Sequence, residues 1–136
     1  MAVLYLGING VLLRSNGTLA PHAGTFLRWA IERHMPFWLT SRDLSGSHAG
    51  IVAAFKDCAE LEPLLPAVTP LAWTGTKTVA IDMDADFYWI AANPPPADHQ
   101  ALDHHDKRAR WVEVDVNVFP DALLAAMTVV DVLCGG

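Results

Sequence analysis

Residues that can bind a metal gather in one segment of this 136-residue chain. Asp98 and His99 are followed by the run Asp-His-His-Asp at residues 103–106. His99 and Asp103 are four residues apart, so on a helix they would share one face and could hold a divalent cation. A metal site needs a third and a fourth ligand, and the sequence does not place them. The cluster therefore fits a solvated helix better than a metal centre.

A second group of reactive residue types lies in a single loop. Ser41, Ser45 and Ser47 are close in sequence to Asp43 and His48, the residue types of a hydrolytic triad. A triad normally draws its members from separate elements. The sequence therefore does not favour a serine hydrolase, and it contains no glycine-rich nucleotide fingerprint.

Composition limits the classes of protein to consider. A chain of 136 residues, 52% hydrophobic and 18% charged, is expected to form one compact domain over residues 1–136. The formal net charge of −6 argues against nucleic acid as a partner, because polyanions bind basic surfaces. No apolar run approaches the ~20 residues that cross a bilayer, so no membrane partner is expected.

Cysteine usage bears on the cellular compartment. Cys58 and Cys134 lie far apart and lack the spacing of metal ligands. The amino terminus has no basic region followed by an apolar stretch and a cleavage site. The sequence therefore predicts reduced, buried thiols in a cytoplasmic protein.

Short apolar runs alternate with segments of helical periodicity, which predicts strands alternating with helices. Strands are expected at residues 2–6, 37–39, within 64–73, at 87–91 and at 111–114, and helices at 23–34, 48–61, 97–107 and 121–133. The residues expected to face the core from the second and fourth helices are Ile51, Val52, Phe55, Cys58, Leu123, Leu124, Met127 and Val130.

This alternation predicts an α/β fold with a parallel sheet covered by helices on both faces. Ligand sites in such sheets lie at the carboxyl ends of the strands. The segments after Leu6, Leu39 and Ile90 are therefore the places where a site is expected.

Four short motifs lie at or near these strand ends. They are Gly7-Ile8-Asn9-Gly10 after the first strand, Thr40-Ser41 after the second, Lys77 before the fourth, and Ala91-Ala92 at its end. With these motifs the chain resembles the haloacid dehalogenase-like (HAD) phosphohydrolase superfamily over nearly its whole length, and most closely a small capless group among uncharacterised bacterial proteins. The resemblance implies a three-layer α/β/α sandwich with a HAD-like Rossmannoid sheet and no sizeable cap.

The resemblance also implies that the catalytic residues are missing. In the superfamily the first strand ends in Asp-x-Asp-Gly, where the first aspartate is the nucleophile and the second is the general acid and base. Gly7 stands at the first position and has no side chain, so the aspartyl-phosphate route is closed. Asn9 stands at the second position and cannot exchange a proton near pH 7.

The magnesium ligands implied by the resemblance are missing as well. The superfamily's fourth strand ends in an aspartate pair, whereas this chain has Ala91 and Ala92. Magnesium requires hard oxygen ligands, usually carboxylates with water and phosphate. With Gly7 also lacking a carboxylate, no magnesium or other cofactor is expected, and the sequence predicts a catalytically inactive pseudoenzyme.

The residues that would face a phosphate are still present. By the resemblance, the hydroxyl at the second strand end contacts phosphate and Lys77 pairs with it. Backbone amides of the turn after the first strand can add hydrogen bonds to an anion without a metal. The other interpretation is that Thr40 only ends a strand and that Lys77 is solvated. The candidate anion-binding residues are Ile8, Asn9, Gly10, Thr40, Ser41 and Lys77.

An alternative function keeps an active site elsewhere. The apolar run 79–81 leads into Asp82-Met83-Asp84, which also looks like a strand ending in Asp-x-Asp. In a permuted arrangement Asp82 would attack and Asp84 would act as acid and base, giving a residual metal-dependent phosphohydrolase. The simpler interpretation is a surface turn before the strand at 87–91, where short acidic residues are common.

The last predicted helix suggests a possible interface. Residues 121–133 are so apolar that the helix could be buried on more than one side, through a homodimer or a protein partner, although core burial explains the pattern nearly as well. The expected partners are thus a phosphate-type small molecule or a protein.

Overall fold

A single parallel sheet forms the centre of the computed structural model, which describes residues 1–134. The strands lie side by side in the order β3-β2-β1-β4-β5, and every neighbouring pair is parallel. This confirms the predicted α/β class with a parallel sheet. The strands are β1 (Val3–Leu6), β2 (Met35–Trp38), β3 (Thr69–Pro70), β4 (Phe87–Ala91) and β5 (Trp111–Glu113).

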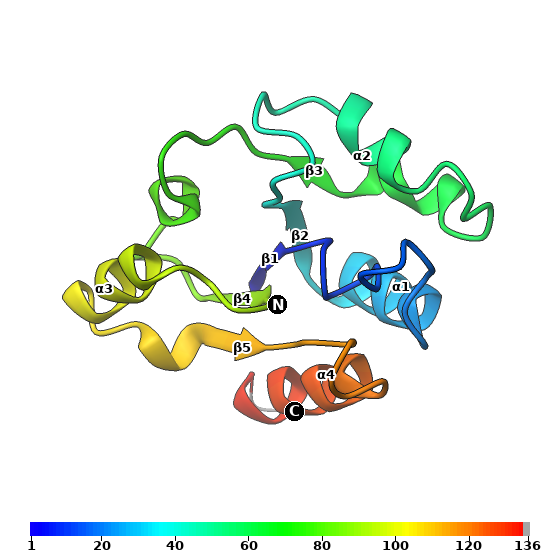
Figure 1. Ribbon diagram of the computed structural model, residues 1–136. Helices are drawn as coiled ribbons and strands as arrows, with labels where there is room; N and C mark the ends of the chain where they lie inside the picture. Colours follow the sequence, from blue (N-terminus) through cyan, green and yellow to red (C-terminus); the bar gives the residue numbers. More distant parts are fainter. Residues whose placement is uncertain (135–136) are drawn as a thin grey trace.

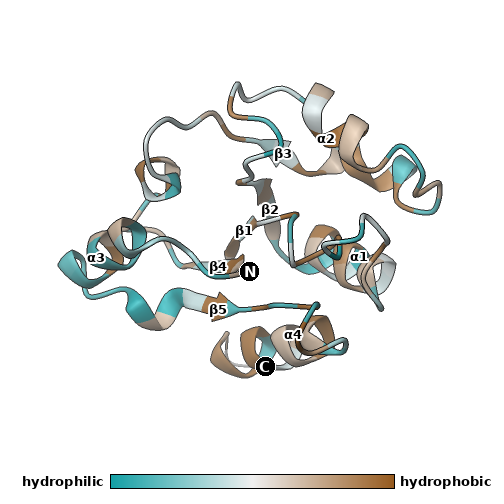
Figure 2. Ribbon diagram, in the orientation of Figure 1, coloured by the Kyte–Doolittle hydropathy of each residue, from teal (hydrophilic) through white to brown (hydrophobic). Residues whose placement is uncertain are grey.

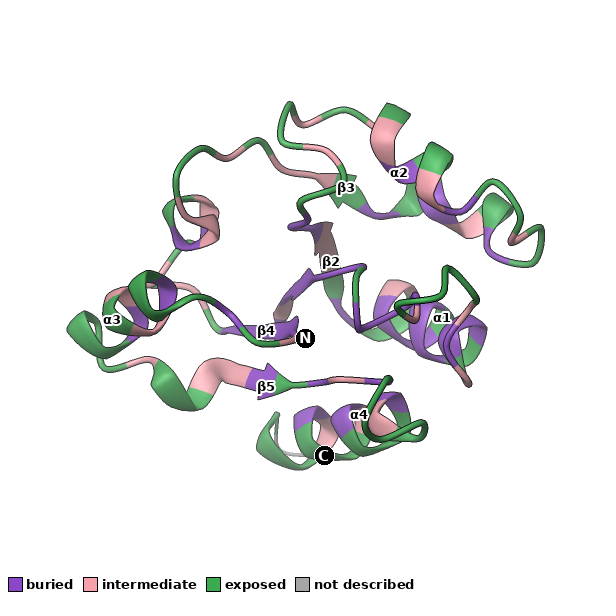
Figure 3. Cartoon of the chain, in the orientation of Figure 1, coloured by how far each residue is buried: buried purple, intermediate pink, exposed green. Residues whose placement is uncertain are grey.

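The two central strands are the most buried. All five residues of β4 are buried, as expected of a continuous apolar run inside a parallel sheet. In β1 the register pairs Tyr5 with Phe37 on one side and with Trp89 on the other. Figure 3 shows β1 and β4 enclosed between the helical layers.

Helices cover both faces of the sheet. Leu4 and Leu6 point into one apolar cluster with α1 (Ala23–Arg33), α2 (Ala49–Ala54) and α4 (Ala122–Leu133). Tyr5 and Trp89 point into a second cluster with α3 (Pro96–His104). Side chains of a strand alternate between faces, so each face has its own core. Figure 1 shows the resulting Rossmann-like sandwich, with α3 on one side and the other three helices opposite.

The second helix is much shorter than predicted. Residues 48–61 were expected to be helical, but α2 ends at Ala54 and Val52 is 51% exposed. The amide of Phe55 is shared between the carbonyl oxygens of Ile51 and Val52, which tightens the last turn. Turns and a 3₁₀ helix, η1 (Glu62–Ala67), follow. Pro63 and Pro66 cannot donate the amide hydrogen that an α-helix requires, so the α-helix does not resume.

The last helix buries a narrower face than predicted. Leu123 and Val130 are buried, but Leu124 is exposed and that prediction is wrong. Leu124 lies on the outer side with Val129, Val132 and Leu133, which are also exposed. Figure 2 shows how apolar α4 is along its length. One side of the helix is sufficient to close the core.

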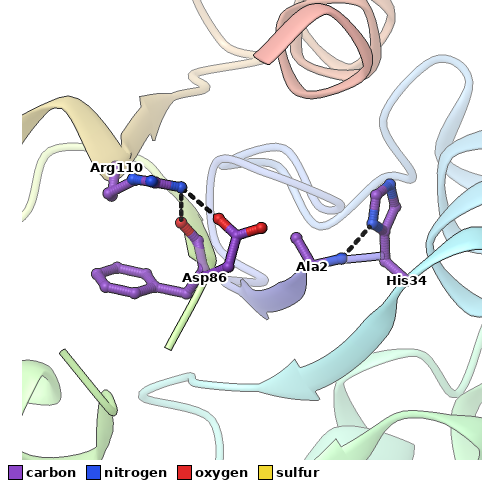
Figure 4. A network of polar contacts seen from close by, with 5 residues as sticks. Ala2, His34, Asp86 and Arg110 are labelled. Carbon is purple, nitrogen blue, oxygen red and sulfur yellow. Dashed lines mark hydrogen bonds and ion pairs between the residues drawn. The ribbon is translucent and has the colours of Figure 1, made fainter. Parts of the chain in front are cut away.

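Polar contacts hold the amino edge of the sheet. Nη1 of Arg110 donates to Oδ1 of Asp86 over 2.6 Å and to the carbonyl oxygen of Phe87 over 3.4 Å. The amide of Ala2 donates to Nδ1 of His34 over 3.0 Å. Figure 4 shows both pairs. They join the starts of four strands, so this edge serves the fold and leaves the opposite edge for a site.

Both cysteines are free, and only one of them is even partly buried. Cys58 is half-buried and Cys134 is exposed, which corrects the expectation of two buried thiols. None of the helices described between residues 1 and 134 is long and apolar enough to cross a membrane.

Candidate functional site

The strand order reverses at β1, which has β2 on one side and β4 on the other. A crevice forms outside the carboxyl ends of the strands at such a point. Gly7 follows β1 there, and its amide donates to the carbonyl oxygen of Ile90 over 2.9 Å. A Cβ atom on Gly7 would lie 3.8 Å from Cα of Ala91. The positions that the resemblance assigned to the nucleophile and to the magnesium ligands therefore adjoin.

A compact turn follows Gly7. The carbonyl oxygen of Ile8 accepts hydrogen bonds from the amides of Val11, Leu12 and Leu13, and the Ile8 side chain is buried. Gly10 has a φ of +75°, and a Cβ atom there would lie 2.9 Å from Cβ of Ala92. A glycine is needed at this position for both reasons. The turn thus brings the segment after β1 tightly against the end of β4.

Some amides of this turn are free for a ligand and others are not. The amide of Gly10 donates to the carbonyl oxygen of Leu13 over 2.8 Å, so it is already used. Within residues 1–134 the amides of Ile8, Asn9 and Ser41 donate to no acceptor. Unpaired amides beside a crevice are suited to an anion.

Thr40 organises the end of β2. The amide of Leu39 donates to the carbonyl oxygen of Leu6, which aligns the ends of β1 and β2. Thr40 is 2% exposed, and its hydroxyl accepts the amide of Arg42 over 3.0 Å. Its carbonyl oxygen accepts the indole N–H of Trp73 over 3.0 Å. In this structure Thr40 therefore positions Arg42 and Trp73, each of which lines a cavity at this edge.

Five of the sequence-derived residues line one cavity of about 310 Å³ at the carboxyl edge: Asn9, Ser41, Lys77, Ala91 and Ala92. We name it the tryptophan cavity, because Trp73 and Trp89 form part of its wall. Sequence reasoning missed both tryptophans as site residues. For Trp73, its closeness to Lys77 in the sequence could have suggested that it lies at the site.

Lys77 is part of the cavity wall and is not simply solvated. It begins the 3₁₀ helix η2 (Lys77–Ala80), with its ammonium 5.7 Å from the centroid of the Trp73 ring. Burial lowers the pKa of Lys77, and the nearby Asp98 carboxylate partly opposes that shift. No carboxylate lies within 4.0 Å of the ammonium among the residues described. The charge of Lys77 is therefore without a close partner.

Asp98 is the buried acid of this region. It is 1% exposed, and Oδ1 accepts hydrogen bonds from the amide of Thr78 over 3.1 Å and from its hydroxyl over 2.8 Å. The expectation of a wholly solvated helix at residues 97–107 is wrong at this residue. Asp98 holds η2 against α3, which fixes the base of Lys77.

A second cavity of about 370 Å³ lies on the other side of Asn9. We name it the arginine cavity, because Arg14 and Arg42 line it. Nε of Arg42 donates to Oδ1 of Asn9 over 2.8 Å. Nε of Arg14 is buried and has no acceptor in the described part of the chain. Arg42 follows Thr40-Ser41 directly, a signal that the sequence interpretation did not use.

The two cavities share Asn9, Ala92 and Asn93 and form one continuous edge. Asn93 has a φ of +43°, a conformation that asparagine tolerates better than most residues. The cations along this edge are Lys77, Arg14 and Arg42, and the carboxylates are Asp98 and Asp115. Cations outnumber carboxylates at an edge where the resemblance would place four further acids.

Asp82 and Asp84 lie elsewhere. Both are exposed, in a turn that precedes the amino end of β4. Oδ1 of Asp82 accepts the amide of Asp84, and the amide of Asp82 donates to the hydroxyl of Tyr5 over 3.1 Å. They line a separate cavity that has only Thr76 in common with the tryptophan cavity. The structure does not bring them to Gly7 or Thr40.

The other candidate clusters have structural partners. Asp103 forms a bidentate pair with Arg108, and the ring of His99 packs on Trp111 at 4.7 Å. In the chain up to residue 134 no three histidine, cysteine or acidic side chains are grouped as metal ligands. Asp43 accepts hydrogen bonds from Ser45, Ser47 and the amide of Gly50, which lower its pKa.

Comparisons with models of protein families, with curated proteins and with solved structures gave no match. What supports a function is therefore the geometry and the chemistry of the carboxyl edge.

Proposed function

We propose that this protein is a catalytically inactive, HAD-like pseudoenzyme that binds a phosphate-type anion without a metal at the carboxyl edge of its sheet. One observation carries the proposal. The positions that adjoin at the crevice are Gly7, Asn9, Ala91 and Ala92, none of which has a carboxylate, while Lys77 and Arg42 lie at the same edge.

The groups at this edge suit an anion. Free amides of Asn9 and Ser41, which line the tryptophan cavity, offer neutral donors, and Lys77 and Arg42 offer charged ones. Hydrogen bonds to an ionised partner are roughly twice as strong as those between neutral groups. The ammonium of Lys77 is partly removed from water, which lowers its pKa, and an anion would restore the missing interaction.

The same geometry opposes phosphoryl transfer. Gly7 offers no nucleophile, and the side-chain oxygen of Asn9 accepts a hydrogen bond from Arg42. The nearest carboxylates at this edge have other partners: Asp98 is held by Thr78, and Asp115 accepts the amide of Asn117 over 3.0 Å. Among residues 1–134, the carboxylates at the crevice are therefore engaged by other groups rather than arranged as an acid and base pair.

Isothermal titration calorimetry with inorganic phosphate tests the proposal. Wild-type protein should bind phosphate in the presence of a chelator, and Lys77→Met should weaken binding about tenfold or more. Lys56→Met is the matched control, because Lys56 is exposed and lines neither cavity. Magnesium-dependent hydrolysis of a phosphate ester that Asp82→Asn abolishes would overturn the proposal in favour of the relocated active site.

A protein partner is a second candidate function, favoured by the outer side of α4. Leu124, Val129, Val132 and Leu133 are all exposed on this helix. Contiguous exposed apolar patches mark sites of protein–protein interaction. A homodimer or another protein would cover them.

The proposed location is the cytoplasm, because free cysteines such as Cys58 and Cys134 are typical of its reducing conditions.

A further inference from the structure

The tryptophan cavity has an aromatic wall as well as an ammonium. Trp89 comes from the centre of β4 and is 1% exposed, and Trp73 is half-buried after β3. The orientation of Trp73 is fixed by its hydrogen bond to the carbonyl oxygen of Thr40. Pro94 and Pro95 line the cavity as well. Part of the wall is therefore formed by rigid apolar side chains that inorganic phosphate alone would not need.

We propose that the ligand is an aromatic phosphate monoester, whose ring occupies the tryptophan cavity and whose phosphate lies at Asn9 between Lys77 and Arg42. This rests on the proposed function and names its ligand class. Offset or edge-to-face packing against tryptophan stabilises a planar aromatic ring whatever its substituents. An aliphatic ester offers no such face.

The size of the cavity supports a single ring system. Its volume of about 310 Å³ lies at the lower end of the ~300–1,000 Å³ range of small-molecule sites. A phenyl ring or a nucleobase fits this space better than a larger polycyclic group does.

The arrangement of the two cavities places the phosphate. Asn9, Ala92 and Asn93 are common to both, so a ligand in the tryptophan cavity can extend past Asn9 toward the arginines. Arg42 already reaches Asn9 from that side. The ring and the phosphate of one ester would thus contact different residues. Their contributions to the binding free energy can therefore be measured separately.

Calorimetry with four probes tests this inference: phenyl phosphate, adenosine monophosphate, glycerol phosphate and inorganic phosphate. The two aromatic esters should bind about tenfold more tightly than glycerol phosphate, as expected when one ring stacks on a tryptophan. Trp73→Leu should remove that preference, so that the variant binds the aromatic esters and glycerol phosphate with equal affinity. Trp73→Phe should keep most of the preference, because the ring remains.

The outcomes separate the inference from the proposed function. Equal affinity for aromatic and aliphatic esters, with inorganic phosphate still bound, would overturn the aromatic ligand and keep the anion site. Failure of all four probes to bind would overturn both. If Trp73→Leu does not fold, the wild-type protein still decides: the indole N–H resonance of Trp73 should shift with phenyl phosphate and not with glycerol phosphate, and the opposite pattern would contradict the inference.

Discussion

Nε of Arg42 donates to the side-chain oxygen of Asn9 over 2.8 Å and joins the end of β2 to the turn after β1. An aspartate at position 9 would neutralise this guanidinium in an ion pair, whereas the amide of Asn9 leaves its charge uncompensated. Asn9 therefore leaves the charge of Arg42 available to a ligand at the crevice.

The first prediction follows from this pair. Asn9→Asp should form a salt bridge with Arg42 and weaken phosphate binding about tenfold, measured by calorimetry at pH 7.5. Asn16→Asp is the control, because it adds the same charge in an exposed turn that lines neither binding cavity. An equal loss of affinity in both variants would mean that only the overall charge matters.

The second prediction concerns Lys77 and pH. Burial holds the pKa of Lys77 below its ordinary value of 10.5, so its ammonium loses its proton at a lower pH than an exposed lysine does. The affinity for inorganic phosphate should therefore fall as the pH rises from 7.5 to 10. Lys77→Arg should remain charged and show a flatter profile. Identical profiles for the two proteins would exclude Lys77 as the titrating ligand.

The third prediction tests the turn against β4. Gly10→Ala places a Cβ atom 2.9 Å from that of Ala92 and forces a positive φ on alanine. It should lower the free energy of unfolding by about 3 kcal/mol, measured by urea denaturation. Gly17→Ala has a φ of +82° with open space around it and should lose only about 1 kcal/mol. Equal losses would show that the close approach to Ala92 does not matter.

The fourth prediction concerns His34 at the opposite edge. Burial, followed by repulsion from the amino-terminal charge, lowers the pKa of His34 below its ordinary value of 6.5. The folded state then favours neutral imidazole, which accepts the amide of Ala2 at Nδ1. This contribution to stability is fully present above about pH 6.5 and is lost as the pH falls through the lowered pKa.

Urea denaturation at several pH values checks that prediction. The midpoint of wild-type protein should decrease between pH 7.5 and pH 5, and His34→Gln should show a smaller decrease because it cannot gain a proton. His104→Gln is the control, since His104 is exposed. If the urea midpoint of His34→Gln depends on pH as strongly as that of the wild-type protein, the effect belongs to other groups.

The fifth prediction tests the outer side of α4. If this side is an interface, the molar mass in solution should rise with protein concentration, and Val132→Asp should abolish the rise. Val132 is 69% exposed, so its replacement should leave the stability of the monomer nearly unchanged. Val79→Asp, at 66% exposure on η2, is the matched control. A constant monomer mass for wild-type protein at all concentrations would exclude a homodimer.

Local patterns were sufficient for the central strands. The apolar runs that become β1 and β4 are continuous and flanked by turn residues, so their burial could be predicted directly. Local patterns failed to predict helix length and helix exposure, which depend on contacts with other parts of the fold. The periodicity at residues 48–61 suggested a long helix, yet the shared amide of Phe55 tightens the turn and the helix ends at Ala54. Pro63 and Pro66 then keep the α-helix from resuming. At Leu124 the periodicity could not show that α4 is covered on one side only.

The sequence by itself determined which chemical groups are present at the ends of β1 and β4: a glycine, an asparagine and two alanines, with no carboxylate among them. Residue identity needs no coordinates. The tertiary structure alone decided what surrounds those positions. Arg42 meets Asn9 across 33 residues of chain, and Trp73 meets Thr40 across the same separation. Such contacts arise because parallel strands bring distant segments to one edge, and no local pattern in the sequence encodes that meeting.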